Sequence, residues 1–135
     1  MIFYFLYYFI IDTIVDIIQP ITKTCINNNH VVFYILLLHH FISCFLIAGW
    51  IFNYKPILLL HFIIVISTIF YWFFNNNLCD LTVYVNKLCG WNENQPFNDL
   101  LNVIGLKKIK AWNEFWHYLL IIIGGFVSLY KIVYK

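Results

Sequence analysis

Residues 31–52, VVFYILLLHHFISCFLIAGWIF, and residues 57–74, ILLLHFIIVISTIFYWFF, decide the fold of this chain. A bilayer core about 30 Å thick is crossed by roughly 17–25 helical residues, so each stretch is long enough to span it. The short polar turn 53–56 separates them, and Pro56 fits the first turn of the second helix because proline has no N–H. The sequence therefore predicts a helical hairpin that crosses a membrane twice.

The composition excludes an ordinary water-soluble domain. Hydrophobic residues make up 63% of the chain and charged residues only 10%, whereas a soluble domain carries about 25% charged residues. So few charges cannot cover the surface of a globule, and we expect the lipid bilayer to surround most of the chain. The formal net charge of +2 is too small for a basic, phosphate-binding surface, so no nucleic-acid partner is expected. We predict an all-α integral membrane protein that forms a single domain over residues 1–135.

A further apolar stretch at residues 117–134, HYLLIIIGGFVSLYKIVY, predicts another transmembrane helix. Aromatic side chains near its start, and tyrosine and lysine near its end, are typical of membrane interfaces. The predicted bundle has three transmembrane helices, or four if residues 1–19 also cross the bilayer.

Residues 1–19 allow more than one interpretation. Asp12 and Asp16 are four residues apart, on one stripe of a helix that Pro20 is expected to end. The segment is either an amphipathic helix that lies at the membrane interface or caps the bundle, or a fourth span with both acids turned toward other helices. An acid facing lipid at mid-bilayer would cost about 2.5–3.5 kcal/mol. An uncleaved signal anchor is a third alternative.

Residues 75–116 form a polar connector with short amphipathic surface helices. Thr82 is a suitable N-cap for a helix over 83–89, and Gly90 occupies the position where a left-handed residue commonly ends a helix. Pro96 begins the second predicted surface helix.

The lysines next to the spans predict the orientation. Five lie on the side of the connector and of the 20–30 loop, and three on the side of the 53–56 turn. This excess favours a cytoplasmic connector, with reduced thiols at Cys25, Cys79 and Cys89. The inverted orientation would instead allow a Cys79–Cys89 disulfide.

Three histidines lie inside the apolar hairpin, and an imidazole in hydrocarbon needs a hydrogen-bond partner. We therefore expect these rings to face neighbouring helices and hold them together. Helical periodicity places each ring on a stripe of small or polar residues. The stripes are His40 with Cys44 and Ala48, His39 with Ser43, and His61 with Thr68 and Trp72.

Haem ligation by His39, His40 or His61 is an alternative interpretation. His40 lies about 18 Å from the turn along its helix and His61 about 6 Å, at a rise of 1.5 Å per residue. This difference in depth suits two ligands of one iron poorly. A proton relay through the histidines and the acidic stripe of Asp12 and Asp16 is the other alternative.

Other motifs give weaker signals. Gly124 and Ser128 form a small-xxx-small face, suited to packing within the chain or to homodimerisation. No catalytic motif is found, so an enzyme is not the favoured interpretation. One set of residues on the connector side has metal-ligand types without ligand spacing: Cys25, His30, Cys79, Asp80, Cys89 and His117.

Residues 36–90 contain LLLHHFISCFLIAGWIF and LLLHFIIVISTIFYWFFNNNLCDLTVYVNKLCG. This pattern resembles small multi-pass membrane proteins of large DNA viruses. It is also similar to a bacterial membrane family of unknown function with a histidine-bearing hairpin followed by Cys-x-Leu-Thr. The matching residues here are Trp72, Cys79, Leu81 and Thr82, besides the hairpin histidines. The resemblance implies a membrane fold in a viral or host membrane, and it implies no activity or cofactor.

We therefore expect a multi-pass membrane protein of structural or interaction type, without a cofactor. It would act alone, as a homo-oligomer or within a larger membrane complex. A haem-binding or redox anchor subunit and a small transporter or proton-conducting subunit are the alternative functions.

Overall fold

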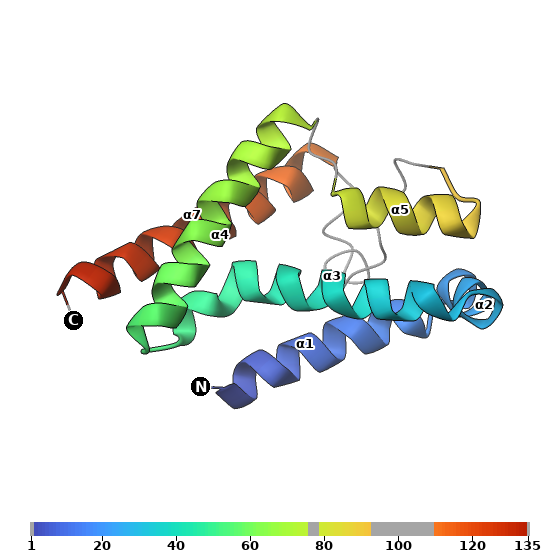
Figure 1. Ribbon diagram of the computed structural model, residues 1–135, viewed down its shortest axis with the longest axis horizontal. Helices are drawn as coiled ribbons and strands as arrows, with labels where there is room; N and C mark the ends of the chain where they lie inside the picture. The colour runs from blue at the N-terminus through green and yellow to red at the C-terminus, as the bar shows by residue number, and fades with distance from the viewer. Residues whose placement is uncertain (1, 76–78, 93–109, 135) are drawn as a thin grey trace.

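The computed structural model describes residues 2–75, 79–92 and 110–134. Every regular element in these ranges is a helix, as the sequence predicts (Figure 1). In chain order the elements are α1 (Ile2–Ile17), α2 (Pro20–Asn28), α3 (His30–Ala48), the 3₁₀ turn η1 (Gly49–Ile51), α4 (Lys55–Phe74), α5 (Asp80–Cys89) and α7 (Lys110–Tyr134).

Two helices in the described ranges are long and apolar enough to cross a membrane. The first is α3 continued by η1, with 22 residues, and the second is α4, with 20 residues. Pro56 lies in the first turn of α4, and Asn29 caps α3 by accepting a hydrogen bond from Val31 N–H at 3.1 Å. The two long apolar helices predicted from the sequence, joined by a short turn, are confirmed.

The chain bends sharply between α1 and α2, which meet at 84°. Gln19 has an extended backbone (ψ 132°) directly before Pro20, because the proline ring disfavours a helical conformation in the preceding residue. The predicted end of the first helix is therefore confirmed. The predicted 20–30 loop is wrong: Pro20 begins α2, since its fixed φ suits a first helical turn.

The connector helix α5 begins two residues before the predicted N-cap. Cys79 is its N-cap residue, so the prediction of Thr82 in that position is wrong. Asp80 lies in the first turn, where a negative charge interacts favourably with the helix dipole. Gly90 ends the helix with φ 68°, as expected, and Trp91 N–H donates to Asn86 O at 2.8 Å. The predicted helix beginning at Pro96 lies outside the described residues.

The C-terminal helix α7 begins at Lys110, seven residues before the predicted start at 117. Its described apolar part, Tyr118–Tyr134, is shorter than the two long spans.

The helices form two pairs that diverge from the α3–α4 turn, one of α1 beside α3 and the other of α4 beside α7 (Figure 1). Both chain termini lie toward the end of the molecule that carries this turn, whereas α2 and α5 lie at the opposite end. Each end has its own apolar cluster. Cys25, Val32, Leu36 and Val85 join α2, α3 and α5, and Leu46, Val65 and Ile121 join α3, α4 and α7.

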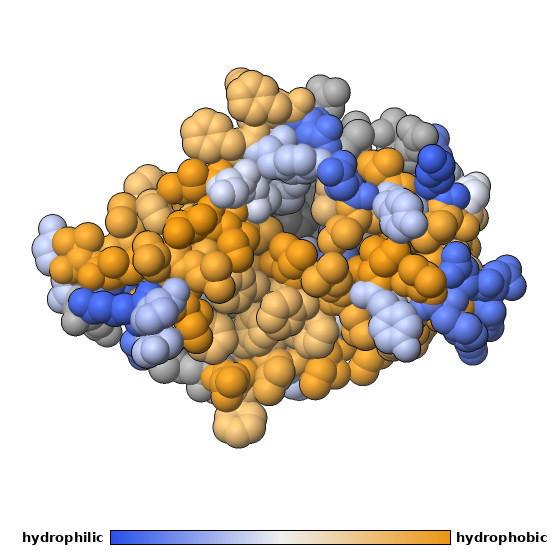
Figure 2. Space-filling view, in the orientation of Figure 1, coloured by the Kyte–Doolittle hydropathy of each residue, from blue (hydrophilic) through white to orange (hydrophobic). Residues whose placement is uncertain are grey.

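Apolar side chains cover most of the face in Figure 2, and polar residues gather toward its ends. Helix α1 likewise has an apolar outward face and buries polar side chains on its inner face. Its two acids, Asp12 and Asp16, are buried against the rest of the molecule. The outward residues of α1 are Ile2, Phe3, Tyr4, Leu6, Tyr7, Ile10 and Ile14.

Candidate functional site

The main polar site is His40 on α3, held between two acids of α1. Its Nδ1 lies 2.7 Å from Asp12 Oδ2, and its Nε2 lies 3.1 Å from Asp16 Oδ2. The four-residue spacing of the acids places one carboxylate on each side of the ring. All three side chains are buried, with His40 only 1% exposed. Both ring nitrogens are therefore occupied by carboxylates from the neighbouring helix.

Helix α2 contributes to the same site. The Thr22 hydroxyl donates to Asp16 Oδ1 at 3.3 Å, so both oxygens of this carboxylate have a polar contact. The break before Pro20 turns the chain back toward α1 and makes this contact possible. Thr13, between the two acids in the sequence, is 6% exposed, and its hydroxyl has no hydrogen-bond partner among the described residues.

A second polar site joins α4 to α7 and to the end of α3. His61 is fully buried, and its Nε2 lies 3.1 Å from Leu46 O while its Nδ1 lies 2.8 Å from Ser128 Oγ. A carbonyl oxygen only accepts, so Nε2–H donates to Leu46 and Nδ1 accepts from the serine hydroxyl. One neutral tautomer of the ring satisfies both contacts.

Glycines bring the backbones close around His61. A Cβ on Gly49 would collide with the His61 ring, and one on Gly124 would lie 2.8 Å from Trp50 Cδ1. The small-xxx-small face of Gly124 and Ser128 is thus occupied inside the chain, by Trp50 and His61. This is the packing alternative for that face.

His39 makes looser contacts at the edge of the hairpin. Its Nε2 lies 3.5 Å from Ser43 Oγ, as the predicted stripe requires, and its Nδ1 lies 3.6 Å from Cys79 Sγ. The ring meets that of His40 edge-on, at 5.6 Å between centroids. His39 thereby links α3 to the N-cap residue of α5.

The other predicted packing residues have ordinary structural environments. Cys44 is fully buried, and Ala48 and Thr68 are half-buried. Trp72 packs edge-on against Tyr118 of α7, at 5.4 Å between ring centroids. Leu81 and Thr82, which carry the family-like motif, are half-buried in α5.

Cys25 of α2 and Cys89 of α5 form a disulfide, with their Cα atoms 5.5 Å apart. The prediction of reduced thiols at these positions is therefore wrong, and the alternative Cys79–Cys89 pairing is also wrong, because Cys79 is free. The count of lysines beside the spans carries no information on which cysteines lie close together in space. The unpredicted helix α2 brings Cys25 against α5.

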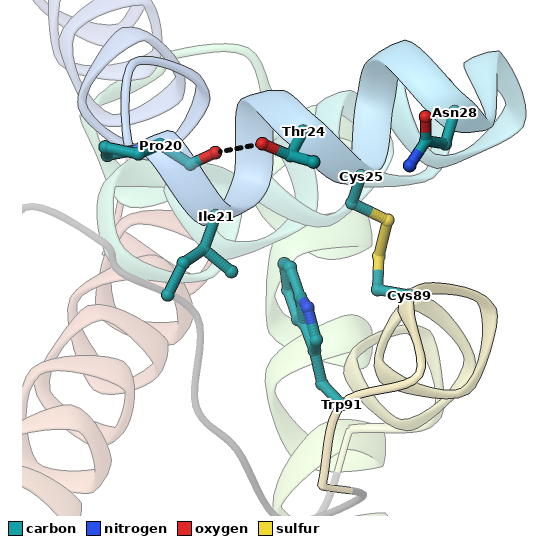
Figure 3. Close-up of a pocket in the computed structure, with 7 residues that line it drawn as sticks. All are labelled: Pro20, Ile21, Thr24, Cys25, Asn28, Cys89 and Trp91. Atoms are coloured by element: carbon teal, nitrogen blue, oxygen red, sulfur yellow. Dashed lines mark hydrogen bonds between the residues drawn. A yellow bond between two sulfur atoms is a disulfide. The ribbon is translucent and has the colours of Figure 1, made fainter.

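The disulfide borders a cavity of about 350 Å³ at this end of the molecule (Figure 3). The indole of Trp91 stands beside the disulfide, and the Thr24 hydroxyl donates to Pro20 O at 2.8 Å along the α2 wall. The remaining lining residues are Ile21 and Asn28.

The predicted metal-ligand set on the connector side is not assembled in the part of the chain that the structure describes. Among those residues, no group of three or more His, Cys, Asp or Glu side chains is arranged to hold a metal ion. Two members of the set, Cys25 and Cys89, bond to each other instead. The side chain of His117 lies outside the description.

The opposite end of the molecule is held by Lys131 near the C-terminus. Its Nζ donates to Trp50 O at 2.8 Å and to Asn53 Oδ1 at 3.1 Å. The ammonium also lies 5.8 Å from the centroid of the Trp50 ring, within reach of a cation–π interaction. The end of α7 is thus attached to the α3–α4 turn.

The fold and these contacts define a helical, membrane-associated protein whose buried polar side chains bond across helices. A scan of family models and searches of curated proteins and solved structures find no match to this chain. The functional argument therefore depends on the chain's own residues.

Proposed function

We propose that this chain is a multi-pass membrane protein of structural or interaction type. The observation that carries the proposal is how its buried polar groups are used. His40 bonds to α1, and His61 bonds to Ser128 of α7 and to a carbonyl of α3. The histidines thus join helices, while the outward faces of α1, α3 and α4 are apolar. Such a chain is suited to be stable in lipid and to present an apolar surface of constant shape to partners in the membrane.

Haem ligation is less well supported than this structural role. A histidine that binds iron uses one ring nitrogen for the metal, but both nitrogens of His40 and of His61 contact protein groups. The two rings also belong to different helix pairs. We also propose a viral or host membrane as the location, on the sequence pattern of residues 36–90 alone.

The purified full chain tests this proposal after expression in a haem-replete host. We expect no Soret band, and we expect His61→Ala and Ser128→Ala each to lower the thermal midpoint in mild detergent. The double variant should be no less stable than the less stable of the two single variants, because both substitutions remove the same His61–Ser128 contact. Additive losses, or a Soret band lost with His40→Ala, would contradict the proposal. Leu59→Ala, on the exposed face of α4, is the control.

We also propose four membrane spans, α1 with α2, α3 with η1, α4 and α7, with the connector in an oxidising compartment. The contact of Lys131 with Asn53 supports a C-terminus on the side of the α3–α4 turn. The Cys25–Cys89 disulfide links α2 and α5 at the other end, and disulfides persist in oxidising compartments. This orientation is the reverse of the one that the lysine count favours, an excess of only five to three.

A thiol-labelling experiment checks the orientation. In a Cys44→Ser, Cys79→Ser background, Cys25 and Cys89 should react with a polymer-linked maleimide only after reduction, giving two mobility shifts. Cys89→Ser should leave one thiol that reacts without reductant. An epitope tag after residue 135 should be detected only in permeabilised cells. Two shifts without reduction, together with a tag detected on intact cells, would support the cytoplasmic connector instead.

A further inference from the structure

The contacts of His40 fix a minimum number of protons. Carboxylate oxygens and unprotonated ring nitrogens are all acceptors, so each contact between the ring and an acid requires one hydrogen. Two contacts, at 2.7 Å to Asp12 and 3.1 Å to Asp16, require two protons among the three groups. With two protons the cluster has a net charge of −1, and a third proton makes it neutral.

The surroundings make that charge costly. Asp12 is 4% exposed and Asp16 and His40 are each 1% exposed, on the inner face of a helix whose outer face is apolar. Moving an unbalanced charge out of water costs several kcal/mol even after the protein relaxes. Uptake of one proton removes this net charge without moving a helix.

The structure also offers a place for the third proton. Asp16 Oδ1 does not face the ring, and it lies 3.3 Å from the Thr22 hydroxyl. A hydroxyl donates to an ionised carboxylate and accepts from a protonated one, so Thr22 can satisfy both states. The buried Thr13 hydroxyl, with no partner in the described chain, is a further polar group in this interface.

Other titratable groups also lie near the cluster in the described chain. On α1, Tyr8 is half-buried one helical turn before Asp12. On α3 they are His39, whose ring contacts that of His40, and the buried thiol of Cys44, one turn beyond it. On the other elements packed here they are Lys23 of α2, exposed beside Thr22, and Cys79, which reaches His39 from the start of α5.

We propose that Asp12, His40 and Asp16 form an exchangeable proton-binding site, with two protons in one state and three in the other. Within the site, Nε2 takes a proton from the Asp16 carboxyl group as Nδ1 passes its own to Asp12. An O–H bond of Asp16 and the Nδ1–H bond break, an Nε2–H bond and an O–H bond of Asp12 form, and there is no oxidation or reduction. This goes beyond the structural role proposed above, which needs no change in proton number.

The test is an NMR titration of the full chain in phosphatidylcholine vesicles, with ¹⁵N-histidine and ¹³C-aspartate labels, between about pH 5 and pH 8. We expect a reversible shift of the His40 ring nitrogens or of the Asp12 and Asp16 carboxyl carbons. Asp16→Asn should abolish it, whereas Asp80→Asn, at an exposed acid of α5, should leave it unchanged.

If the resonances of all three groups stay constant across this pH range, the proposal is wrong. The cluster then keeps one protonation state and serves only to join the helices. A shift that survives Asp16→Asn and Asp12→Asn alike would overturn it too. Formation of the Cys25–Cys89 disulfide, seen on a non-reducing gel, shows that a variant has folded. The titration of the unmodified chain decides the question even where a variant does not fold.

Discussion

Replacing His40 with leucine should lower the free energy of unfolding by about 3–5 kcal/mol, the usual cost of removing one partner from a buried charged pair. The imidazole supplies a polar contact to both Asp12 and Asp16, at 2.7 and 3.1 Å. Without it, two carboxyl groups stay in an apolar interface with few polar contacts. Reversible unfolding in mixed detergent micelles measures the loss.

A variant that removes the whole cluster is the matched control. Asp12→Leu, His40→Leu and Asp16→Leu together leave no acid at this site, and replacing a buried ionic group by apolar residues is often neutral or stabilising. We expect this triple variant to recover most of the stability lost by His40→Leu alone. If the triple variant is as unstable as the single one, the loss comes from packing and the cluster is not the cause.

The sequence predicted the parts of the fold that depend on local pattern. The apolar runs 31–52 and 57–74 became α3 with η1 and α4, because their length and hydropathy are properties of consecutive residues. The helix break before Pro20 and the helix end at Gly90 were predicted for the same reason, since proline and glycine act on their own backbone.

For contacts between residues far apart in the sequence, we could predict which side chains need a polar partner but not which partner each one meets. Acids turned toward other helices were one of three alternatives for the segment that carries Asp12 and Asp16, and His40 indicated a ring in need of a hydrogen-bond partner. Nothing in the sequence spacing showed that His40 would bond to these two acids, which lie 28 and 24 residues before it. The available signal was a pair of acids four residues apart in one apolar segment and a histidine in the next apolar segment.

The disulfide was missed because its geometry depends on an element that the sequence analysis treated as a loop. Cys25 and Cys89 are 64 residues apart, and they meet only because α2 folds back against α5. Pro20 was interpreted only as the end of a helix, although proline equally suits the first turn of the next one. The lysine count then predicted reduced thiols at the two positions that form the disulfide.

Gly49→Ala should lower the free energy of unfolding by about 1–3 kcal/mol, the cost of inserting a methyl group into a filled interface. Gly49 follows directly on α3 and is buried, and a Cβ there would collide with the His61 ring. The ring cannot yield without losing its contacts to Leu46 O and Ser128 Oγ, which fix it at 3.1 and 2.8 Å. The same unfolding measurement in mixed micelles checks the value.

A second substitution separates this steric effect from a backbone effect. Gly49 has φ −62°, a helical value that alanine adopts readily, so the methyl group costs nothing through the backbone itself. In a His61→Ala background the ring is gone, and Gly49→Ala should then be close to neutral. Equal losses from Gly49→Ala in both backgrounds would show that His61 does not set the requirement for glycine. The close approach of η1 to α4 would then have another cause.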